Sequence, residues 1–325
     1  MIYNQWYAVL PSKAVKRNQV IGVKRLNLHL AFFRREDGVL GCVEDQCTHR
    51  GAALSKGKVK GNCIECPFHG IQFDEQGKCT LIPANGRASK ADISRYNIHN
   101  WIVCEHAGII YLWYGDQEKA EEHLPFFDED VDDSWVYSEI EDAWNSHYSR
   151  CIENQLDVVH LPFIHYNTIG RGNKTIVNGP KVELFDGGLV TSANNDVDEG
   201  QAPKGADQCV IKTTYLKFLY PNLWMNHISD KMKVIIYFAP VDDENTILYI
   251  RFYSKAAGNK AGDACIAWLG KFGNRIIERQ DKRIVITQQP KASSYRSQEK
   301  LVAGDAPIIQ YRRIREELKN KGQNI

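Results

Sequence analysis

Four residues early in the chain have the types and spacing of metal ligands. Cys47 precedes His49 by two positions, and sixteen residues later Cys66 precedes His69 by three. Two thiolates and two imidazoles can hold a [2Fe–2S] cluster in which one iron takes both cysteines and the other takes both histidines. Neutral imidazoles make such a cluster less negative, which raises its reduction potential to between about −150 and +300 mV. The spacing therefore predicts an electron-accepting iron–sulfur centre.

A zinc site is the alternative for the same region. Cys63 and Cys66, taken with Cys42 and Cys47, could form the four-cysteine set of a zinc ribbon. The gap from Cys42 to Cys47 is at the long end of zinc-site spacings, and this arrangement leaves both histidines unexplained. We therefore expect Cys63 to be structural. Nine cysteines without an export signal also predict a reducing, cytoplasmic location, where disulfides are rare.

A second group of candidate ligands lies later in the chain. His160 and His165 could supply the histidines of the two-histidine, one-carboxylate set that binds Fe(II) in non-haem oxygenases. That set leaves positions open for dioxygen and substrate. Five residues is a poor helical repeat, because helical neighbours are three or four apart. We expect Pro162 to break the helix between the histidines and to bring His165 round to the metal.

Together the two regions resemble the Rieske non-haem iron oxygenases, the aromatic-ring-hydroxylating oxygenase family. The segment CTHRGAAL, followed by CPFHGIQFD, is similar to the cluster-binding box of that family, and Asn154, Asp157 and Pro162 match the pattern around its iron histidines. Rieske proteins of respiratory complexes carry two further cysteines, where this chain has Ala52 and Phe68. The resemblance covers both halves of the chain. It implies one Rieske [2Fe–2S] cluster and one mononuclear Fe(II) per subunit.

The resemblance also implies roles for single residues. The family's third iron ligand is a carboxylate on a late helix, which favours Asp281, with Glu278 as the second candidate. Asp157 matches the aspartate that links a cluster histidine of a neighbouring subunit to an iron histidine, here His160. Asn154 belongs to the same catalytic segment. Transfer across a subunit boundary implies a ring-shaped homo-oligomer, which we expect to be a homotrimer.

The activity implied by the resemblance is that of a terminal oxygenase. Electrons from NAD(P)H would arrive through a separate reductase, with or without a ferredoxin, because the chain has no Gly-rich nucleotide fingerprint and no plant-type cluster motif. The short chain is similar to the homotrimeric branch with the vanillate and dicamba O-demethylases. That favours monooxygenation, as hydroxylation or O- or N-demethylation, over ring cis-dihydroxylation. A Rieske electron-transfer or sensing protein without oxygenase activity is the alternative of another class.

The elements that must position these residues predict an α+β protein. Short strands and turns over residues 1–116 predict an all-β cluster domain. Residues 117–143 are acidic, which predicts a linker or surface segment. Residues 144–325 predict an α+β catalytic domain, helix-grip-like by resemblance, with a central antiparallel sheet. Its helix over residues 262–289 carries an apolar stripe, which comprises Ile266, Leu269, Phe272, Ile276 and Ile277.

A substrate pocket is expected on the strands of the second domain, where apolar and aromatic residues gather. The candidates are Tyr215, Phe218, Tyr220, Leu223, Trp224, Met225, Ile236 and Phe238. By strand alternation, at least half of them should belong to the core. An apolar pocket suits a hydrophobic, aromatic or cyclic substrate, and Asn226 and His227 could orient a polar substituent. A net charge of +1 gives no electrostatic reason to expect binding to nucleic acid or to a membrane.

Overall fold

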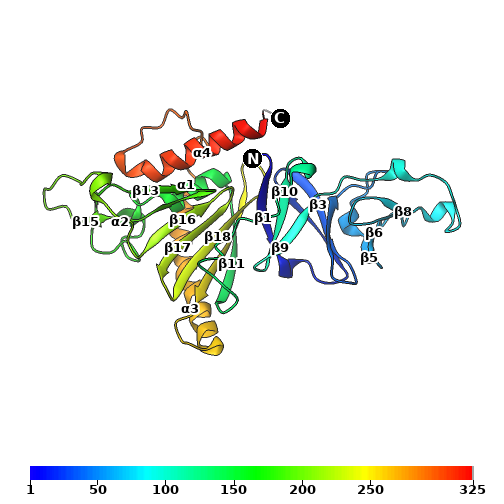
Figure 1. Cartoon of the computed structure of the whole chain (residues 1–325), viewed down its shortest axis with the longest axis horizontal. Coiled ribbons are helices and arrows are strands. Elements are labelled where there is room, and N and C mark those ends of the chain that lie inside the picture. Colours follow the sequence, from blue (N-terminus) through cyan, green and yellow to red (C-terminus); the bar gives the residue numbers. More distant parts are fainter. Residues whose placement is uncertain (324–325) are drawn as a thin grey trace. The chain divides into compact units, whose positions relative to one another are not determined.

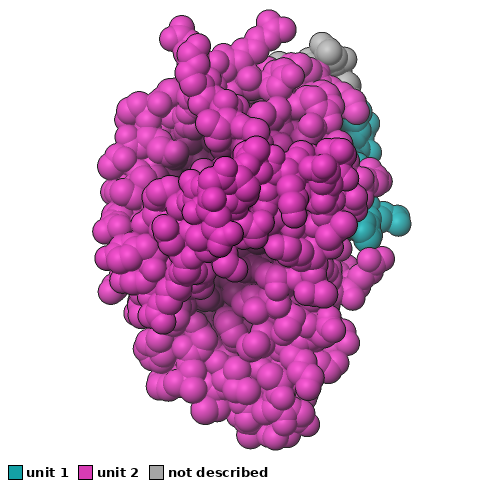
Figure 2. All heavy atoms as spheres, turned by 90° about the vertical axis from the view of Figure 1, so that its left-hand side faces the viewer, with its two compact units in different colours: residues 1, 3–124 teal, residues 2, 125–325 magenta. Residues whose placement is uncertain are grey.

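The computed structural model describes residues 1–323 and has two compact units, which Figure 2 draws in different colours. Unit 1 consists of residues 1 and 3–124, and unit 2 consists of residue 2 and the chain from residue 125 onward. Each unit has sheets of its own, which Figure 1 shows in the colours of the sequence. No helix within residues 1–323 is both long and apolar enough to span a bilayer.

Unit 1 is built from three small antiparallel sheets, with short 3₁₀ turns between strands. Their strand orders are β1–β10–β9, β2–β3–β4 and β5–β6–β7–β8. The strands are β1 (Gln5–Pro11), β2 (Gln19–Arg25), β3 (Leu28–Arg34), β4 (Leu40–Glu44), β5 (Lys58–Lys60), β6 (Cys63–Glu65), β7 (Gln72–Phe73), β8 (Cys79–Leu81), β9 (Val103–His106) and β10 (Ile109–Tyr114). The prediction of an all-β first domain is confirmed.

Unit 2 is dominated by a seven-stranded antiparallel sheet, in the order β11–β19–β18–β17–β16–β14–β13. Its strands are β11 (Val136–Trp144), β13 (Val182–Phe185), β14 (Gly188–Thr191), β16 (Tyr215–Leu219), β17 (Leu223–Ser229), β18 (Met232–Pro240) and β19 (Thr246–Ser254), and a two-stranded ribbon joins β12 (Ile176–Val177) to β15 (Asn195–Asp196). The helices are α1 (Tyr148–Leu156), α2 (Leu161–Ile164), α3 (Lys260–Val285) and α4 (Ala306–Gln323). The predicted α+β domain with a central antiparallel sheet is confirmed.

The large sheet is covered on both faces, which explains why β18 is buried continuously from its second residue to its last. Helix α1 packs against β18, α3 packs against β11 and β19, and α4 lies against β13 and β14 (Figure 1). The opposite face is covered by residues from the acidic segment. There Asp130 accepts a hydrogen bond from Lys217 Nζ at 2.9 Å, and Lys233 Nζ lies 4.1 Å from the ring centre of Trp135.

The acidic segment therefore differs from the expectation for residues 117–143. Its second half packs on the sheet and supplies β11, which pairs with β19 along its whole length, from Val136 opposite Ser254 to Trp144 opposite Thr246. The strand is hard to see in the sequence because Glu139, Glu141 and Asp142 interrupt its apolar positions, although the Glu139 side chain is buried in an ion pair with Arg251. The acidic composition thus does not mark a linker throughout.

One expectation about helices is wrong, and the apolar stripe of α3 lies mostly on its exposed side. Pro162 does not break a helix between the histidines: α1 ends at Leu156, Asp157 has extended backbone angles, and Pro162 lies in the first turn of α2, where proline is well tolerated. In α3, most of the apolar stripe faces outward. Four large apolar residues there, which we call the α3 apolar face, are 45–56% exposed: Trp268, Leu269, Phe272 and Ile276.

The side of α3 that is buried is largely polar. It comprises Asp263, Ala267, Glu278, Asp281 and Val285. The apolar side of a surface helix normally faces the protein core. In α3 the arrangement is reversed, because the side that lines the candidate site carries polar groups. This reversal is what brings the late carboxylates of α3 into the interior of unit 2.

Candidate active site

Two matching loops in unit 1 carry the first group of predicted ligands. In each loop a glycine N–H donates to the carbonyl oxygen of the cysteine four residues earlier, Gly51 to Cys47 at 2.8 Å and Gly70 to Cys66 at 3.0 Å. The two glycines have φ values of 72° and 70°, a region that residues with a Cβ rarely adopt. The same cysteine-to-glycine turn therefore occurs twice, with the histidine two residues after Cys47 in the first loop and three residues after Cys66 in the second.

The four side chains form a buried pair and an exposed pair. Cys47 and Cys66 are each 2% exposed. Burial, together with the neighbouring Cys66 thiol, raises the pKa of Cys47 to about 11. His49 and His69 are exposed, and their Nδ1 atoms lie 3.2 Å apart. Two sulfurs inside and two converging ring nitrogens at the surface fit a cluster whose two irons take different ligands.

The alternative four-cysteine zinc site does not assemble. Cys63 Sγ lies 3.3 Å from the hydroxyl oxygen of Thr80, and Cys42 is fully buried in β4, where it pairs with Phe32. Within residues 1–323, the one group of three or more close potential donor atoms comes from His160, His165 and Asp281.

That second group lies in unit 2, where α2 and α3 meet. His160 precedes α2, His165 follows it, and Asp281 projects from the last third of α3. One ligand atom from each lies within 4.8 Å of the other two. Asp281 Oδ1 is 2.9 Å from His165 Nε2 and 3.5 Å from His160 Nε2. The three side chains are between 1% and 11% exposed.

The carboxylate oxygen at the centre of this group is not satisfied by hydrogen bonds. In the described part of the chain, Asp281 Oδ1 accepts no aligned hydrogen bond, although two imidazole nitrogens face it. Burial lowers the pKa of His165 and the facing Asp281 carboxylate raises it, with a net increase. A divalent cation among the three atoms would satisfy the oxygen, and two imidazoles with one carboxylate are the donor set of non-haem Fe(II).

The orientation of His165 is fixed by a residue that the sequence did not reveal. Gln280 Oε1 lies 2.9 Å from His165 Nδ1 and accepts a hydrogen bond from Thr168 Oγ1, also at 2.9 Å. An amide oxygen can only accept, so His165 carries its proton on Nδ1 and directs the Nε2 lone pair at Asp281. The position of Gln280, next to the candidate carboxylate, is a signal that could have suggested it.

The remaining predicted residues occupy different places around the group. Asp157 is the C-cap residue of α1, and its Oδ2 lies 3.2 Å from His160 Nδ1. Asn154 lines the adjoining cavity. Glu278 points elsewhere: its Oε1 is 3.3 Å from Trp144 Nε1, and burial, with nearby Asp142, raises the pKa of Glu278 to about 8. The structure thus brings Asp281, not Glu278, to the two histidines.

A cavity of about 410 Å³ opens beside the three residues. One wall is the large sheet, whose inward side chains there include Trp224 and Asn226 but are mostly aliphatic: Leu216, Val234, Ile236, Leu248 and Ile250. Helices α1, α2 and α3 supply most of the other walls, and residues such as Ile169, Ala193 and Lys212 complete them. Figure 2 shows that the face of unit 2 turned to the viewer is hollowed. Of the eight predicted pocket residues, Tyr215, Trp224 and Ile236 line the cavity, and the other five do not.

Comparison with known proteins agrees with this geometry. Residues 5–100 match the family described as Rieske [2Fe-2S] domain, and residues 144–321, more than half of the chain, match the vanillate O-demethylase oxygenase C-terminal domain. The chain belongs to the Rieske non-haem iron oxygenases. The predicted family is therefore confirmed, and with it a domain of the kind that carries a [2Fe–2S] cluster.

Curated relatives of this Rieske oxygenase include enzymes that act on ring systems. Cholesterol 7-desaturase nvd of Bombyx mori is 33% identical over 168 residues, which are 51% of this chain and 36% of the relative. The probable 3-ketosteroid-9-alpha-monooxygenase oxygenase component of Rhodococcus rhodochrous is 33% identical over 143 residues, 42% of this chain and 35% of the relative. These alignments span about a third of the length of each relative.

Solved structures share the fold over the whole chain. NdmA of Pseudomonas putida CBB5 with caffeine superposes with a TM-score of 0.81 at 24% identity and covers 99% of this chain and 92% of that one. Dicamba monooxygenase bound to dicamba gives a TM-score of 0.72 at 18% identity and covers 100% and 99%. At these identities the likeness establishes the fold.

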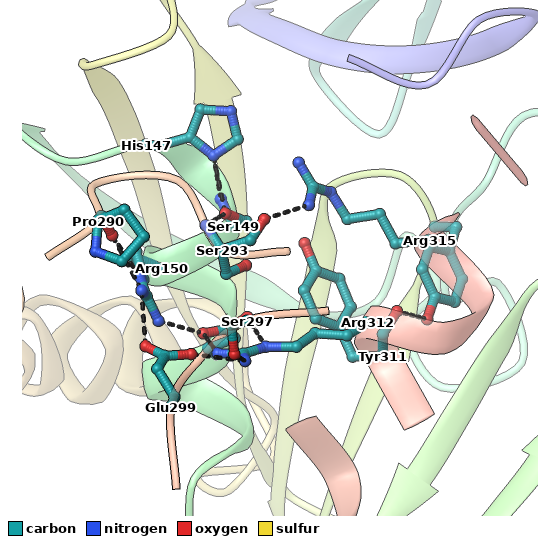
Figure 3. A network of polar contacts seen from close by, with 12 residues as sticks. His147, Ser149, Arg150, Pro290, Ser293, Ser297, Glu299, Tyr311, Arg312 and Arg315 are labelled. Carbon is teal, nitrogen blue, oxygen red and sulfur yellow. Dashed lines mark hydrogen bonds and ion pairs between the residues drawn. The ribbon is translucent and has the colours of Figure 1, made fainter. Parts of the chain in front are cut away.

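In this Rieske oxygenase, α1 is anchored by a buried charge network that the sequence analysis missed. Glu153 accepts from Arg312 of α4 at 2.8 Å through both carboxylate oxygens, and from Arg150 at 3.1 Å. Glu299 binds Arg150 at 2.7 Å and Arg312 at 2.6 Å. Figure 3 shows Arg150, Glu299 and Arg312 in this network. Because Asn154 and Asp157 also belong to the α1 region, the network fixes where they stand.

Proposed function

We propose that the chain is the terminal oxygenase component of a Rieske oxygenase system and catalyses monooxygenation of a hydrophobic, cyclic substrate by hydroxylation or O- or N-demethylation. The observation that carries this proposal is the buried group of His160, His165 and Asp281 at a 410 Å³ cavity, in a chain that also has a Rieske domain. An electron-transfer protein has no need of such a cavity. The mostly apolar sheet wall of this cavity fits a substrate without charge.

In the proposed mechanism, His160, His165 and Asp281 would hold Fe(II), and Cys47, His49, Cys66 and His69 would hold the cluster. Iron in such a site supplies the activation of dioxygen, using electrons that the cluster provides. Gln280 keeps His165 in the tautomer that presents Nε2. The Asp157 carboxylate lies beside His160 Nδ1, where it would orient this histidine as an iron ligand. The mostly aliphatic sheet wall excludes water around the substrate.

The expected partners follow from what is exposed. His49 and His69 lie at the surface of unit 1, and the Asp157 side chain is 24% exposed, so each is accessible to another protein. We propose that a separate NAD(P)H-dependent reductase, with or without a ferredoxin, reduces the cluster. We also propose a homotrimer in which Asp157 links His160 to a cluster histidine of a neighbouring copy. None of the nine cysteines, all within the described residues, forms a disulfide, and we propose a reducing compartment such as the cytoplasm.

Ring-bearing molecules are named for several of the relatives: caffeine with NdmA, dicamba with its monooxygenase, cholesterol and a 3-ketosteroid for the curated enzymes. The aliphatic wall of this cavity suits the same broad class. We therefore propose a cyclic substrate and favour monooxygenation over cis-dihydroxylation, because the solved neighbours include dicamba monooxygenase and a protein that binds N-methylated caffeine.

Metal analysis and turnover test the proposal. Anaerobically purified protein should contain about three irons and two acid-labile sulfides per chain and give a Rieske-type EPR signal after reduction. The variant His160→Ala should keep the cluster signal and lose both one iron and all substrate oxidation. The matched control is His123→Ala, which changes an exposed histidine of unit 1. Product carrying label from isotopic dioxygen would support the oxygenase; a fully active His160→Ala protein would refute it.

A further inference from the structure

Besides His160 Nδ1 and Asp281 Oδ1 of the proposed iron site, four polar side-chain atoms in the cavity wall have no hydrogen-bond partner among residues 1–323. They are Asn154 Nδ2, Trp224 Nε1, Asn226 Oδ1 and Asn274 Nδ2. Buried polar atoms in folded proteins are nearly always paired, because an unpaired one loses its bonds to water and gains none in return. Asn154 stands near the proposed iron site. The side chains of the other three have no role in the proposed mechanism.

Two of these residues belong to the sheet wall. Trp224 and Asn226 are two positions apart in β17, so their side chains leave the same face of the sheet. In β18, Ile236 pairs with Trp224 and Val234 pairs with Asn226, and both β18 residues line the cavity. The two polar groups are thus neighbours within an otherwise aliphatic wall. A ligand that rests on this wall meets an apolar surface with two hydrogen-bonding points.

The third residue belongs to the helical wall. Asn274 precedes Asp281 by seven residues, which is two turns of α3, so both side chains leave the same side of the helix. Two turns advance the helix by about 10 Å. Asn274 therefore marks the far part of the cavity, about 10 Å along α3 from the proposed iron ligand. A ligand that touches both ends must be longer than a single ring.

The chemistry of the three groups defines what they would recognise. The indole N–H of Trp224 can only donate, so it needs an acceptor such as a carbonyl or hydroxyl oxygen. Each asparagine amide offers an acceptor oxygen and a donor NH2 group, whichever way it is turned. All three groups are neutral. The cation in the described cavity lining is Lys212, which is exposed. These buried groups therefore match neutral polar substituents.

We propose that the substrate is a neutral, rigid molecule of two or more fused rings that carries a hydrogen-bond acceptor bound by Trp224 Nε1 and a second polar substituent bound by Asn226 or Asn274. This rests on the proposed function, since it assigns the substrate of the same cavity. The polar groups fix the orientation of the rings, and an apolar part of the skeleton is left at the iron site. A bare hydrocarbon would leave the buried groups unpaired and would bind weakly.

Binding can be measured apart from turnover. Anaerobic calorimetry on the whole, cluster-loaded chain would compare three probes with one skeleton: tetralin, 1-tetralone and 6-hydroxy-1-tetralone. They carry no polar atom, one acceptor, and an acceptor with a hydroxyl. A net hydrogen bond changes affinity by about 2- to 10-fold. The dissociation constant should therefore fall in two steps along the series, each of about that size.

Variants assign the steps to residues. Trp224→Phe removes the N–H and keeps an aromatic ring, so it should weaken the two ketones by about 2- to 10-fold and leave tetralin unchanged. Trp268→Phe makes the same replacement on the exposed α3 apolar face and should change none of the three. The hydroxy ketone should bind more tightly than the ketone in the unchanged chain. Asn226→Leu, Asn274→Leu or the double variant should abolish this difference in affinity. Should Asn226→Leu fail to fold, Asn274→Leu, on the partly exposed helix, keeps this step testable.

Equal affinity for the three probes would overturn the proposal, as would undetectable binding of the hydroxy ketone at its solubility limit. A Trp224→Phe protein that loses tetralin and ketone equally would also overturn it. Oxygen uptake and product formation with a surrogate reductase report separately on the proposed function. If affinity rises stepwise along the probe series but no product forms, the proposed oxygenase activity is refuted and the proposed binding site is kept. If product forms but the three probes bind with equal affinity, the binding site is refuted and the oxygenase activity is kept.

Discussion

The hydrogen bond between Gln280 and His165 allows a quantitative prediction about iron binding. Gln280→Leu preserves the approximate size of the side chain and removes the acceptor that lies 2.9 Å from His165 Nδ1. It also removes the bond from Thr168 Oγ1, which holds the Gln280 side chain in place. Without the acceptor, the His165 ring can turn or change tautomer, and its Nε2 lone pair no longer faces Asp281.

The expected size of the effect can be worked out in two ways. Each lost hydrogen bond is worth about 0.5–1.5 kcal/mol, so the two together cost about 1–3 kcal/mol. Since about 1.4 kcal/mol corresponds to a factor of ten, Fe(II) affinity should fall by about 5- to 150-fold. Independently, loss of the residue that orients a ligating histidine typically weakens metal binding by about 10- to 100-fold. The two ranges overlap, and we expect a loss near the middle of them.

The assay is an anaerobic Fe(II) titration of protein that keeps its cluster and has been stripped of mononuclear iron, with a competing chelator to set the free-metal level. Asn167→Ala is the matched control, because it removes only the bond from Gln280 Nε2 and leaves the acceptor side intact. The control should change affinity by less than about threefold. If Gln280→Leu binds Fe(II) as tightly as the unchanged chain, His165 is not a ligand or is not held by Gln280.

Three further outcomes are expected. Glu153→Gln should lower the free energy of unfolding by about 3–5 kcal/mol in urea titrations, because it leaves two buried guanidinium groups undercompensated, whereas Glu317→Gln on an exposed pair should cost less than about 1 kcal/mol; equal effects would contradict this. Asp157→Asn should keep all metal and slow the reoxidation of the reduced cluster by dioxygen in the presence of substrate, and an unchanged rate would remove Asp157 from the electron route. Burial raises the pKa of Glu278 from 4.5 to about 8, so the folded chain binds a proton that the unfolded chain releases, and stability should fall as pH rises between these values. Glu278→Gln should remove this fall in stability between pH 5 and pH 8, as measured by the midpoint of urea unfolding. If the midpoints of the unchanged chain and the variant changed with pH in parallel, the predicted direction would be contradicted.

The sequence was most informative where ligands lie close together in the chain. Cys47 with His49, and Cys66 with His69, are each confined to one short loop, so their spacing alone limits where the side chains can go. Asp281 is different, because it meets His160 and His165 from a helix more than a hundred residues later. No local spacing predicts that meeting, and resemblance to a family was needed to select Asp281.

Periodicity was least informative in α3. An apolar stripe normally marks the buried side of a helix, but here Leu269 and Phe272 are exposed while Glu278 and Asp281 are buried. The rule fails because this helix lines a site whose groups must be polar. The same reason hid Gln280 and Asn274, whose importance depends on which residues of other elements they face. Such facing is a property of the tertiary fold, which the apolar periodicity of the local sequence does not report.

The alternation of side chains in β17 has a consequence for how the enzyme can change its specificity over time. Trp224, Asn226 and Ile228 line the cavity, whereas Leu223 and Met225 face the other way and are fully buried. Substitutions at the first set can therefore alter which molecules are accepted while the packing behind the sheet stays the same. Insertion or loss of one residue in this strand would exchange the two sets. We expect lineages of such enzymes to diverge in substrate by point replacement here, with the length of the strand held constant.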